Sequence, residues 1–286
     1  MCGIVGYIGN KNASEIILDG LKRLEYRGYD SAGISTIQGG KISTTKYKGK
    51  VKYLENKLDP KTHSGKIGIG HTRWATHGRP SNENSHPHND TENKISLIHN
   101  GIIENHYTLK KYLVSKNYQF KSDTDTEVLV QLIHYIHKTQ KGDFIESVRT
   151  ALHEIVGTYG IAIISEDEPD KLIAARLGSP LIIGIGKNEY FVASDSSPII
   201  EHTRNIVVLD EGEMAIITKD TYEIRKIETN DLVNKEIEKI EHSIDQIEKG
   251  DFEHFMLKEI YEQPTSLLAS VRGRISLENY ELHLGG

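Results

Sequence analysis

The order in which the expected strands and helices follow one another constrains the fold of this chain most strongly. Strand patterns occupy much of residues 3–73, three helical patterns follow between about residues 104 and 156, and strands return from Tyr159 to about Ile227. This order lacks the regular strand–helix alternation of a Rossmann fold. It predicts an α+β fold in which sheets pack against each other and helices cover the outside.

Several of the expected strands are continuous apolar runs, which are typical of strands covered on both faces. The later runs are Ile161–Ile164, Leu181–Gly184, Tyr190–Ala193 and Ile206–Leu209. Near the start of the chain, Gly3–Gly9 is rich in β-branched residues and punctuated by glycine. This segment predicts a buried strand that holds Cys2 at its end.

Local signals predict the remaining elements around a long central loop. Apolar spacing, capping residues and turn dipeptides predict helices and strands. The segments are a helix over 12–25, a hairpin of strands 31–37 and 41–47 joined by Gly39-Gly40, a strand 66–73, a strand 95–99 and a helix 252–261 ending at Gln263-Pro264. Residues 74–93 lack periodicity, and loops of this length are usually functional or disordered.

Length and charge pattern predict one large domain followed by a short additional segment. A chain of 286 residues with 37% hydrophobic residues can form one large domain or slightly more. Residues 229–250 are densely charged and resemble a solvated connector. We therefore expect one large domain, a charged connector and a final segment that is cut short.

The overall charge and the single cysteine exclude several classes of function. The 35 basic and 41 acidic side chains give a net charge of -6, which offers no reason to expect nucleic acid or an anionic membrane as partner. The sequence has no secretory leader pattern and no apolar run near the ~20 residues that span a bilayer. We expect a cytoplasmic protein. One cysteine excludes an internal disulfide framework.

That cysteine, Cys2, lies where removal of Met1 would make it the amino terminus. The processed residue would carry a thiol and a free α-amine, whose usual pKa values lie near ~8.5 and ~7.7–8.0. The amine could therefore accept the proton of the thiol, and one residue would be both nucleophile and base. The alternatives are a structural cysteine or a retained Met1.

A nucleophile that attacks a carbonyl needs hydrogen-bond donors for the oxyanion that forms. Asn100 and Gly101 follow the expected strand 95–99, and the Asn amide next to a Gly main-chain N–H supplies two such donors. Glycine also lets the main chain approach a ligand closely. The alternative for Asn100-Gly101 is an ordinary hairpin turn.

Arg73 and Asp125 are candidates for binding the charged groups of a ligand. Arg73 ends an expected strand and could bind a carboxylate through two parallel hydrogen bonds. Thr124 and Glu127 resemble a capping box, which places Asp125 in the first helical turn. Asp125 could bind an ammonium group there or only complement the helix dipole. An isolated surface charge is the alternative for Arg73.

Histidines around the long loop leave a metal-binding module open as an alternative. They are His71, His77, His86, His88 and His99. Their spacing matches no established ligand pattern, and cysteine ligands are missing. Such a module would have the loop as its site and Cys2 as an incidental residue.

Taken together, the sequence blocks resemble the glutaminase half of the class II, N-terminal-nucleophile glutamine amidotransferases. The resemblance extends over almost the whole chain. The blocks are 2–6 (CGIVG), 24–33 (LEYRGYDSAG), 71–78 (HTRWATHG), 99–105 (HNGIIEN) and 122–127 (SDTDTE).

The resemblance implies a four-layer αββα fold for residues 1–240 and a site that cleaves L-glutamine without a metal or organic cofactor. It also implies individual roles. Cys2 would be both nucleophile and base, and Asn100 and Gly101 would form the oxyanion hole. The substrate carboxylate would be held by Arg73, Thr76 and His77, and its α-amine by Asp125. Arg27 would support the amino terminus, and Trp74 would be a gate for ammonia.

Two further blocks, Glu25–Asp30 and Lys258–Pro264, resemble the amino-sugar branch of the family. This resemblance implies that the full-length protein is a homodimer with a sugar-phosphate isomerase domain that binds fructose 6-phosphate. By the same resemblance, we expect residues 1–240 to be the glutaminase domain, and residues 241–286 to be a linker and the start of that isomerase domain, which would otherwise be absent. The purine-pathway branch remains the alternative within the family.

Overall fold

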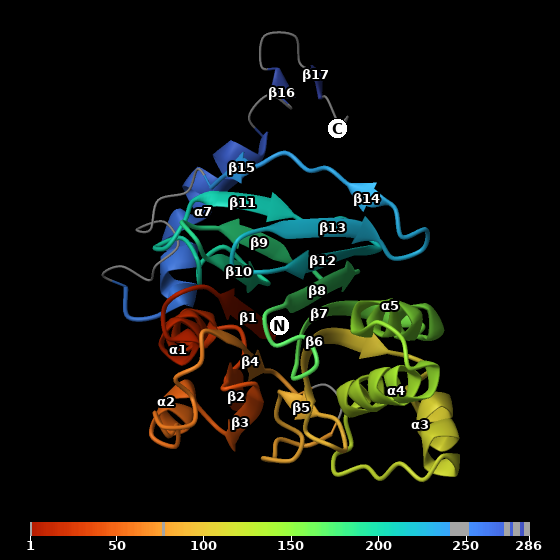
Figure 1. The fold of residues 1–286 in the computed structure, drawn as a ribbon. Helices are drawn as coiled ribbons and strands as arrows, with labels where there is room; N and C mark the ends of the chain where they lie inside the picture. The colour runs from red at the N-terminus through yellow and green to blue at the C-terminus, as the bar shows by residue number, and fades with distance from the viewer. Residues whose placement is uncertain (1, 76–77, 241–251, 272–274, 277–280, 283–286) are drawn as a thin grey trace. The chain divides into compact units, whose positions relative to one another are not determined.

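The computed structural model describes residues 2–75, 78–240, 252–271, 275–276 and 281–282 (Figure 1). The chain separates into two compact units, Met1–Glu241 and His242–Gly286. The second unit contains helix α7 (Phe255–Val271) and the short strands β16 (Ile275–Ser276) and β17 (Glu281–Leu282). No helix within these ranges combines the length and apolar character needed to cross a membrane.

The helix predicted to end at Gln263 continues through Pro264 to Val271, so this prediction was wrong. Proline removes one main-chain donor from a helix interior and usually bends or ends the helix. Here α7 spans 17 residues, and most of the residues around Pro264 are good helix formers. The loss of one hydrogen bond does not end a helix of this length.

The larger unit contains an antiparallel sheet of eight strands in the order β15-β11-β9-β10-β1-β4-β2-β3. Its strands are β1 (Gly3–Ile8), β2 (Ser31–Gln38), β3 (Lys41–Lys48), β4 (Ile67–Arg73), β9 (Ile182–Ile185), β10 (Tyr190–Ala193), β11 (Asn205–Val208) and β15 (Glu238–Lys239). Gly39 and Gly40 join β2 to β3 with φ values of 58° and 75°, which confirms the predicted hairpin.

A second antiparallel sheet has seven strands in the order β14-β13-β12-β8-β7-β6-β5. Its strands are β5 (His88–Asn89), β6 (Ile95–Ile103), β7 (Gly157–Ser165), β8 (Leu172–Leu177), β12 (Glu213–Ile217), β13 (Tyr222–Lys226) and β14 (Leu232–Val233). The strand expected to end at His99 continues to Ile103, because Asn100 and Gly101 pair with Gly160 and Tyr159 of β7. Asn100-Gly101 is therefore not a hairpin turn.

The two sheets face each other and are covered by helices, which confirms the four-layer αββα fold. Ile98, Ala162 and Ile164 point toward the first sheet and share an apolar core with Ile4 and Ile69. The alternate residues of the same strands point to the outer face, because side chains in a strand alternate between faces. This alternation explains why the strands are apolar along their whole length.

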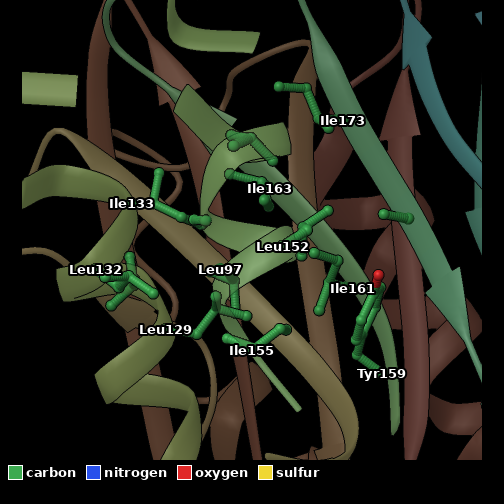
Figure 2. Close-up of a cluster of buried hydrophobic side chains, with 14 of the residues drawn as sticks. Leu97, Leu129, Leu132, Ile133, Leu152, Ile155, Tyr159, Ile161, Ile163 and Ile173 are labelled. Atoms are coloured by element: carbon green, nitrogen blue, oxygen red, sulfur yellow. The ribbon is translucent and has the colours of Figure 1, made fainter. Parts of the chain in front are cut away.

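Helices α1 (Ala13–Leu24) and α2 (Val51–Glu55) cover the outer face of the first sheet. Helices α3 (His106–Ser115), α4 (Asp125–Gln140) and α5 (Phe144–Glu154) cover the second (Figure 1). Figure 2 shows Leu129 and Ile133 of α4 packed with Leu97, Ile161 and Ile163 of the sheet.

Capping residues fix where α4 begins and thereby place Asp125. The Thr124 side chain accepts a hydrogen bond from the Glu127 main-chain N–H, as a capping residue does. The expected return bond from the Glu127 carboxylate to Thr124 is not formed. That carboxylate accepts from the main-chain N–H groups of Lys121 and Ser122 instead, at 2.8 and 2.6 Å, because the preceding loop folds back over the helix start.

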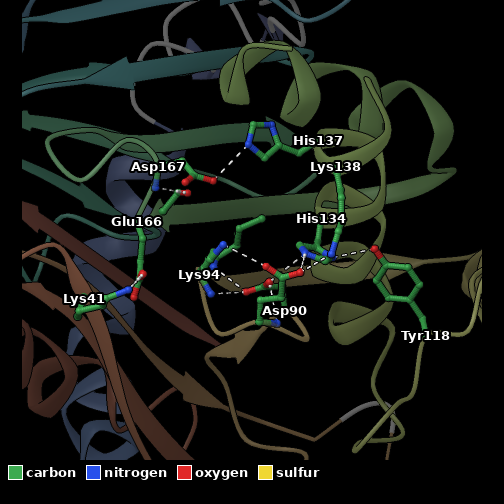
Figure 3. Close-up of polar contacts among 12 residues, drawn as sticks. Lys41, Asp90, Lys94, Tyr118, His134, His137, Lys138, Glu166 and Asp167 are labelled. Carbon is green, nitrogen blue, oxygen red and sulfur yellow. Dashed lines mark hydrogen bonds and ion pairs between the residues drawn. The ribbon is translucent and has the colours of Figure 1, made fainter. Parts of the chain in front are cut away.

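Polar contacts attach the end of the long loop to α4 (Figure 3). One Asp90 carboxylate oxygen accepts from the main-chain N–H groups of Lys94 and Ile95, both at 2.7 Å. The His134 ring lies between Asp90, at 3.5 Å, and the Tyr118 hydroxyl, at 2.7 Å. These contacts hold β6 and α4 in one arrangement, and both elements contribute residues to the site described below.

Gly33 of β2 allows the loop main chain at His86 to approach the first sheet. A methyl group at Gly33 would lie 2.1 Å from the His86 carbonyl oxygen, well inside contact distance. We expect Gly33→Ala to lower the free energy of unfolding by about 1–3 kcal/mol, measured by urea denaturation. Gly142→Ala is the matched control, because Gly142 has nothing within 4 Å. Equal effects of the two substitutions would contradict this packing.

Candidate active site

A cavity of about 380 Å³ opens where the two sheets and the start of α4 meet. Most of the residues predicted from the sequence line it. They are Cys2 immediately before β1, Arg73 at the end of β4, Asn100 and Gly101 in β6, Asp125 at the start of α4, and Arg27 and Trp74. The predicted residues Thr76 and His77 lie outside the described residues.

The Cys2 thiol is half-buried beside the main chain of Trp74. The Trp74 N–H donates to Sγ at 3.2 Å, and the Trp74 carbonyl oxygen lies 3.5 Å from Sγ. Burial raises the pKa of the Cys2 thiol above its usual value, and the Trp74 N–H opposes this shift without cancelling it. A thiol in this position is protonated at neutral pH and needs a base to become a nucleophile.

Asn100 lies beside Cys2, across the gap between the two sheets. Its Nδ2 donates to the Cys2 main-chain oxygen at 3.1 Å, and its Oδ1 lies 2.9 Å from Nε2 of His71. The next residue, Gly101, has a φ of 133°. A side chain there would place Cβ 2.1 Å from the Thr158 carbonyl oxygen. Only glycine fits this position without displacing the strand.

Arg73 and Asp125 contribute opposite charges to the cavity, and both side chains are buried. The Arg73 guanidinium donates to the Gly78 carbonyl oxygen at 3.1 Å, which positions the start of the long loop. One Asp125 carboxylate oxygen accepts from the Ile103 main-chain N–H at 2.8 Å. This bond fixes the carboxylate between α4 and the end of β6.

Arg27 and Trp74 lie at the margin of the cavity. The Arg27 guanidinium forms an ion pair with Asp195 at 2.8 Å, and the neighbouring Ser194 accepts a hydrogen bond from the Ile4 N–H at 3.0 Å. Trp74 is 48% exposed and packs edge-on against Tyr29, with 5.4 Å between ring centroids. A large exposed ring thus stands at the opening beside the thiol.

The buried histidines near the loop pack as neutral rings. His71 and His86 stack with 4.3 Å between centroids, and burial lowers the pKa of both below the usual range. His88 and His99 are bonded to the hydroxyls of Thr124 and Thr126 at 3.0 and 3.1 Å. Among the described residues, no three His, Cys, Asp or Glu side chains form a group that could hold a metal ion.

Other cavity residues carry no sequence signal that predicts a role in the site. Thr158, Ser179, Pro180 and Ser194 reach the cavity from three different segments. They are common residue types without characteristic spacing, so only the packing of the two sheets brings them together.

Comparison with known sequences shows similarity to glutamine amidotransferases. A profile described as "Glutamine amidotransferase domain" matches residues 71–201. The chain is 50% identical over 290 residues to glutamine–fructose-6-phosphate aminotransferase of Chlorobaculum tepidum, which covers all of this chain and 47% of the relative. The corresponding protein of Methanosarcina mazei is also 50% identical, with 96% and 46% coverage.

Solved structures agree with this placement. Glutamine phosphoribosylpyrophosphate amidotransferase of B. subtilis matches with a TM-score of 0.69 and 29% identity, over 80% of this chain and 50% of that one. A glutamine aminotransferase class-II domain protein from Silicibacter pomeroyi has a TM-score of 0.53 at 16% identity, which shows the fold alone.

The fold, the site and these similarities are those of a glutamine amidotransferase domain of the N-terminal-nucleophile type. Its sequence relatives are glutamine–fructose-6-phosphate aminotransferases, of which it covers the glutamine amidotransferase half. The chain spans about half the length of these relatives.

Proposed function

We propose that this chain hydrolyses L-glutamine to glutamate and ammonia through a thioester on Cys2. After loss of Met1, the free α-amine of Cys2 takes the proton of the thiol, and the sulfur attacks the amide carbon of the substrate. The oxyanion is stabilised by Asn100 and Gly101, ammonia leaves, and water hydrolyses the thioester. The amide nitrogen leaves with a proton returned by the amine.

The position of Cys2 next to Asn100 carries this proposal. The Asn100 amide donates to the main-chain oxygen of Cys2 at 3.1 Å. It is therefore close enough to bond the oxyanion of a substrate carbon attached to the Cys2 sulfur. The raised pKa of the thiol explains why a base on the same residue is useful. Thr76 and His77 complete the proposed substrate-binding set with Arg73 and Asp125.

The names of the relatives suggest the fate of the ammonia. We infer that residues 1–240 form the glutaminase domain and that residues 241–286 lead into a domain that binds fructose 6-phosphate. Ammonia would pass from Cys2 past Trp74 to that sugar phosphate and give glucosamine 6-phosphate. The full-length protein would work as a homodimer, and no step requires a metal or organic cofactor.

The experiment that tests the proposal measures glutamate release by this chain and by the full-length protein, with and without fructose 6-phosphate. We expect this chain to release glutamate slowly and independently of the sugar phosphate, and the full-length protein to be accelerated by it. If fructose 6-phosphate changed the rate of glutamate release by this 286-residue chain, the domain assignment would be contradicted. Absence of glutamate release would contradict the proposed activity itself.

The charged groups of the cavity predict the effect of substitutions on substrate affinity. We expect Asp125→Asn to weaken glutamine binding by about 1.5–3 kcal/mol, the usual range for hydrogen bonds to charged groups. Arg73→Lys weakens it as well, because an ammonium group cannot form the paired hydrogen bonds of a guanidinium. The Michaelis constants of both variants check this prediction, and wild-type values would contradict the proposed placement of the substrate.

A further inference from the structure

The contacts of Asn100 determine which of its two side-chain groups faces the nucleophile. The Cys2 main-chain oxygen, 3.1 Å away, can only accept a hydrogen bond, so the NH₂ group of Asn100 faces Cys2. The other end of the amide, Oδ1, then faces Nε2 of His71 at 2.9 Å. An amide oxygen can only accept, so Nε2 of His71 carries a hydrogen and donates it.

His71 is suited to this contact over a wide range of pH. It lies in β4 with its side chain fully buried, and burial lowers the pKa of its ring to about 3. The ring is therefore neutral and has one hydrogen, which Nε2 uses for Asn100. Its other nitrogen, Nδ1, has no hydrogen-bond partner among the described residues, as expected for the nitrogen that lacks the hydrogen.

We infer that His71 is a positioning residue for the oxyanion hole, and this inference rests on the proposed glutaminase activity. Its Nε2–H holds Oδ1 of Asn100 away from the reacting carbonyl, so that the amide NH₂ faces the oxyanion. If the side-chain amide of Asn100 flipped, a lone pair of Oδ1 would face the developing negative charge. The contact links β4, which also carries Arg73, to β6 on the opposite sheet.

A general structural role for His71 makes a different prediction from a positioning role. Loss of a buried hydrogen bond lowers stability wherever it lies. Loss of the contact to Asn100 lowers the rate of the chemical step in particular. His63 provides the comparison, because it is also buried and bonds Thr36 and Thr45 at 3.0 and 2.9 Å, away from the residues that line the cavity.

The test compares substitutions of His71 that keep or remove the donor at the Nε2 position. Met preserves the size of the side chain without a donor, whereas Gln places an amide nitrogen close to the position of Nε2. We expect His71→Met to lower kcat about 10- to 100-fold with KM changed less than about threefold, and His71→Gln to stay within about fivefold of wild type. His63→Met should leave kcat within about twofold.

A double-mutant cycle with Asn100→Ala separates positioning from any other effect. If His71 acts through Asn100, His71→Met lowers kcat less than about twofold in the Asn100→Ala background. An equal fall in kcat in both backgrounds would overturn the inference. So would a rise in KM without a fall in kcat. If His71→Met does not fold, His71→Asn replaces it, because the shorter amide does not reach Oδ1.

A second measurement tests the same idea through binding. The aldehyde analogue of the glutamine side chain forms a tetrahedral adduct with Cys2, whereas glutamate forms none. We expect His71→Met to weaken binding of the aldehyde about 10-fold or more, and to weaken binding of glutamate less than about threefold. A wild-type chain without glutaminase activity contradicts the proposed function, whereas an active wild type with an unaffected His71→Met variant contradicts only the role of His71.

Discussion

Replacing Cys2 with alanine is expected to lower the rate of glutamate release by at least about 10⁴-fold. Removal of a nucleophile abolishes the covalent route, and the remaining hydrogen-bond donors leave only a small residual acceleration. The cavity contains no second thiol, because Cys2 is the chain's single cysteine. The measurement is glutamate formation at saturating glutamine.

Two controls separate lost chemistry from lost structure. Cys2→Ser keeps a polar group beside the Trp74 main chain, so its thermal unfolding midpoint should lie within a few degrees of wild type while its activity remains low. Intact-mass analysis of the active wild-type protein should show that Met1 is absent. An active protein that retains Met1 would contradict the use of the α-amine as base.

The second largest effect is expected at Asn100. We expect Asn100→Ala to lower kcat by about 10²–10³-fold, the usual cost of removing one oxyanion donor, with little change in KM. Asn100→Asp should be at least as harmful, because it keeps the shape of the side chain but places a carboxylate oxygen where negative charge develops. The measurement is the steady-state rate over a range of glutamine concentrations.

Asn89→Ala is the matched control for Asn100→Ala. Asn89 lies in β5, where its amide donates to the Thr44 hydroxyl at 2.9 Å, and it does not line the cavity beside Cys2. Alkylation of Cys2 by a small haloacetamide should proceed at the wild-type rate in Asn100→Ala, because this reaction forms no oxyanion. A rise in KM without a fall in kcat would contradict the assignment of Asn100.

Local sequence signals determined the types of most elements and singled out Cys2 as the proposed nucleophile. Continuous apolar runs predicted strands covered on both faces, and Ile98, Ala162 and Ile164 do point into the core between the sheets. Asn12 caps α1, and Thr124 caps α4. Cys2 could be proposed from the sequence because a terminal residue needs no tertiary partner to combine a thiol with an amine.

Tertiary structure decided what depends on residues far apart in the chain. Asn100-Gly101 belongs to β6 rather than to a turn because β7 offers a pairing partner through Ile103. Glu127 bonds Lys121 and Ser122 because the loop folds back over the helix start. His71 reaches Asn100 because β4 and β6 lie in facing sheets, and hydrogen bonds between strands of different sheets leave no periodic trace in the sequence.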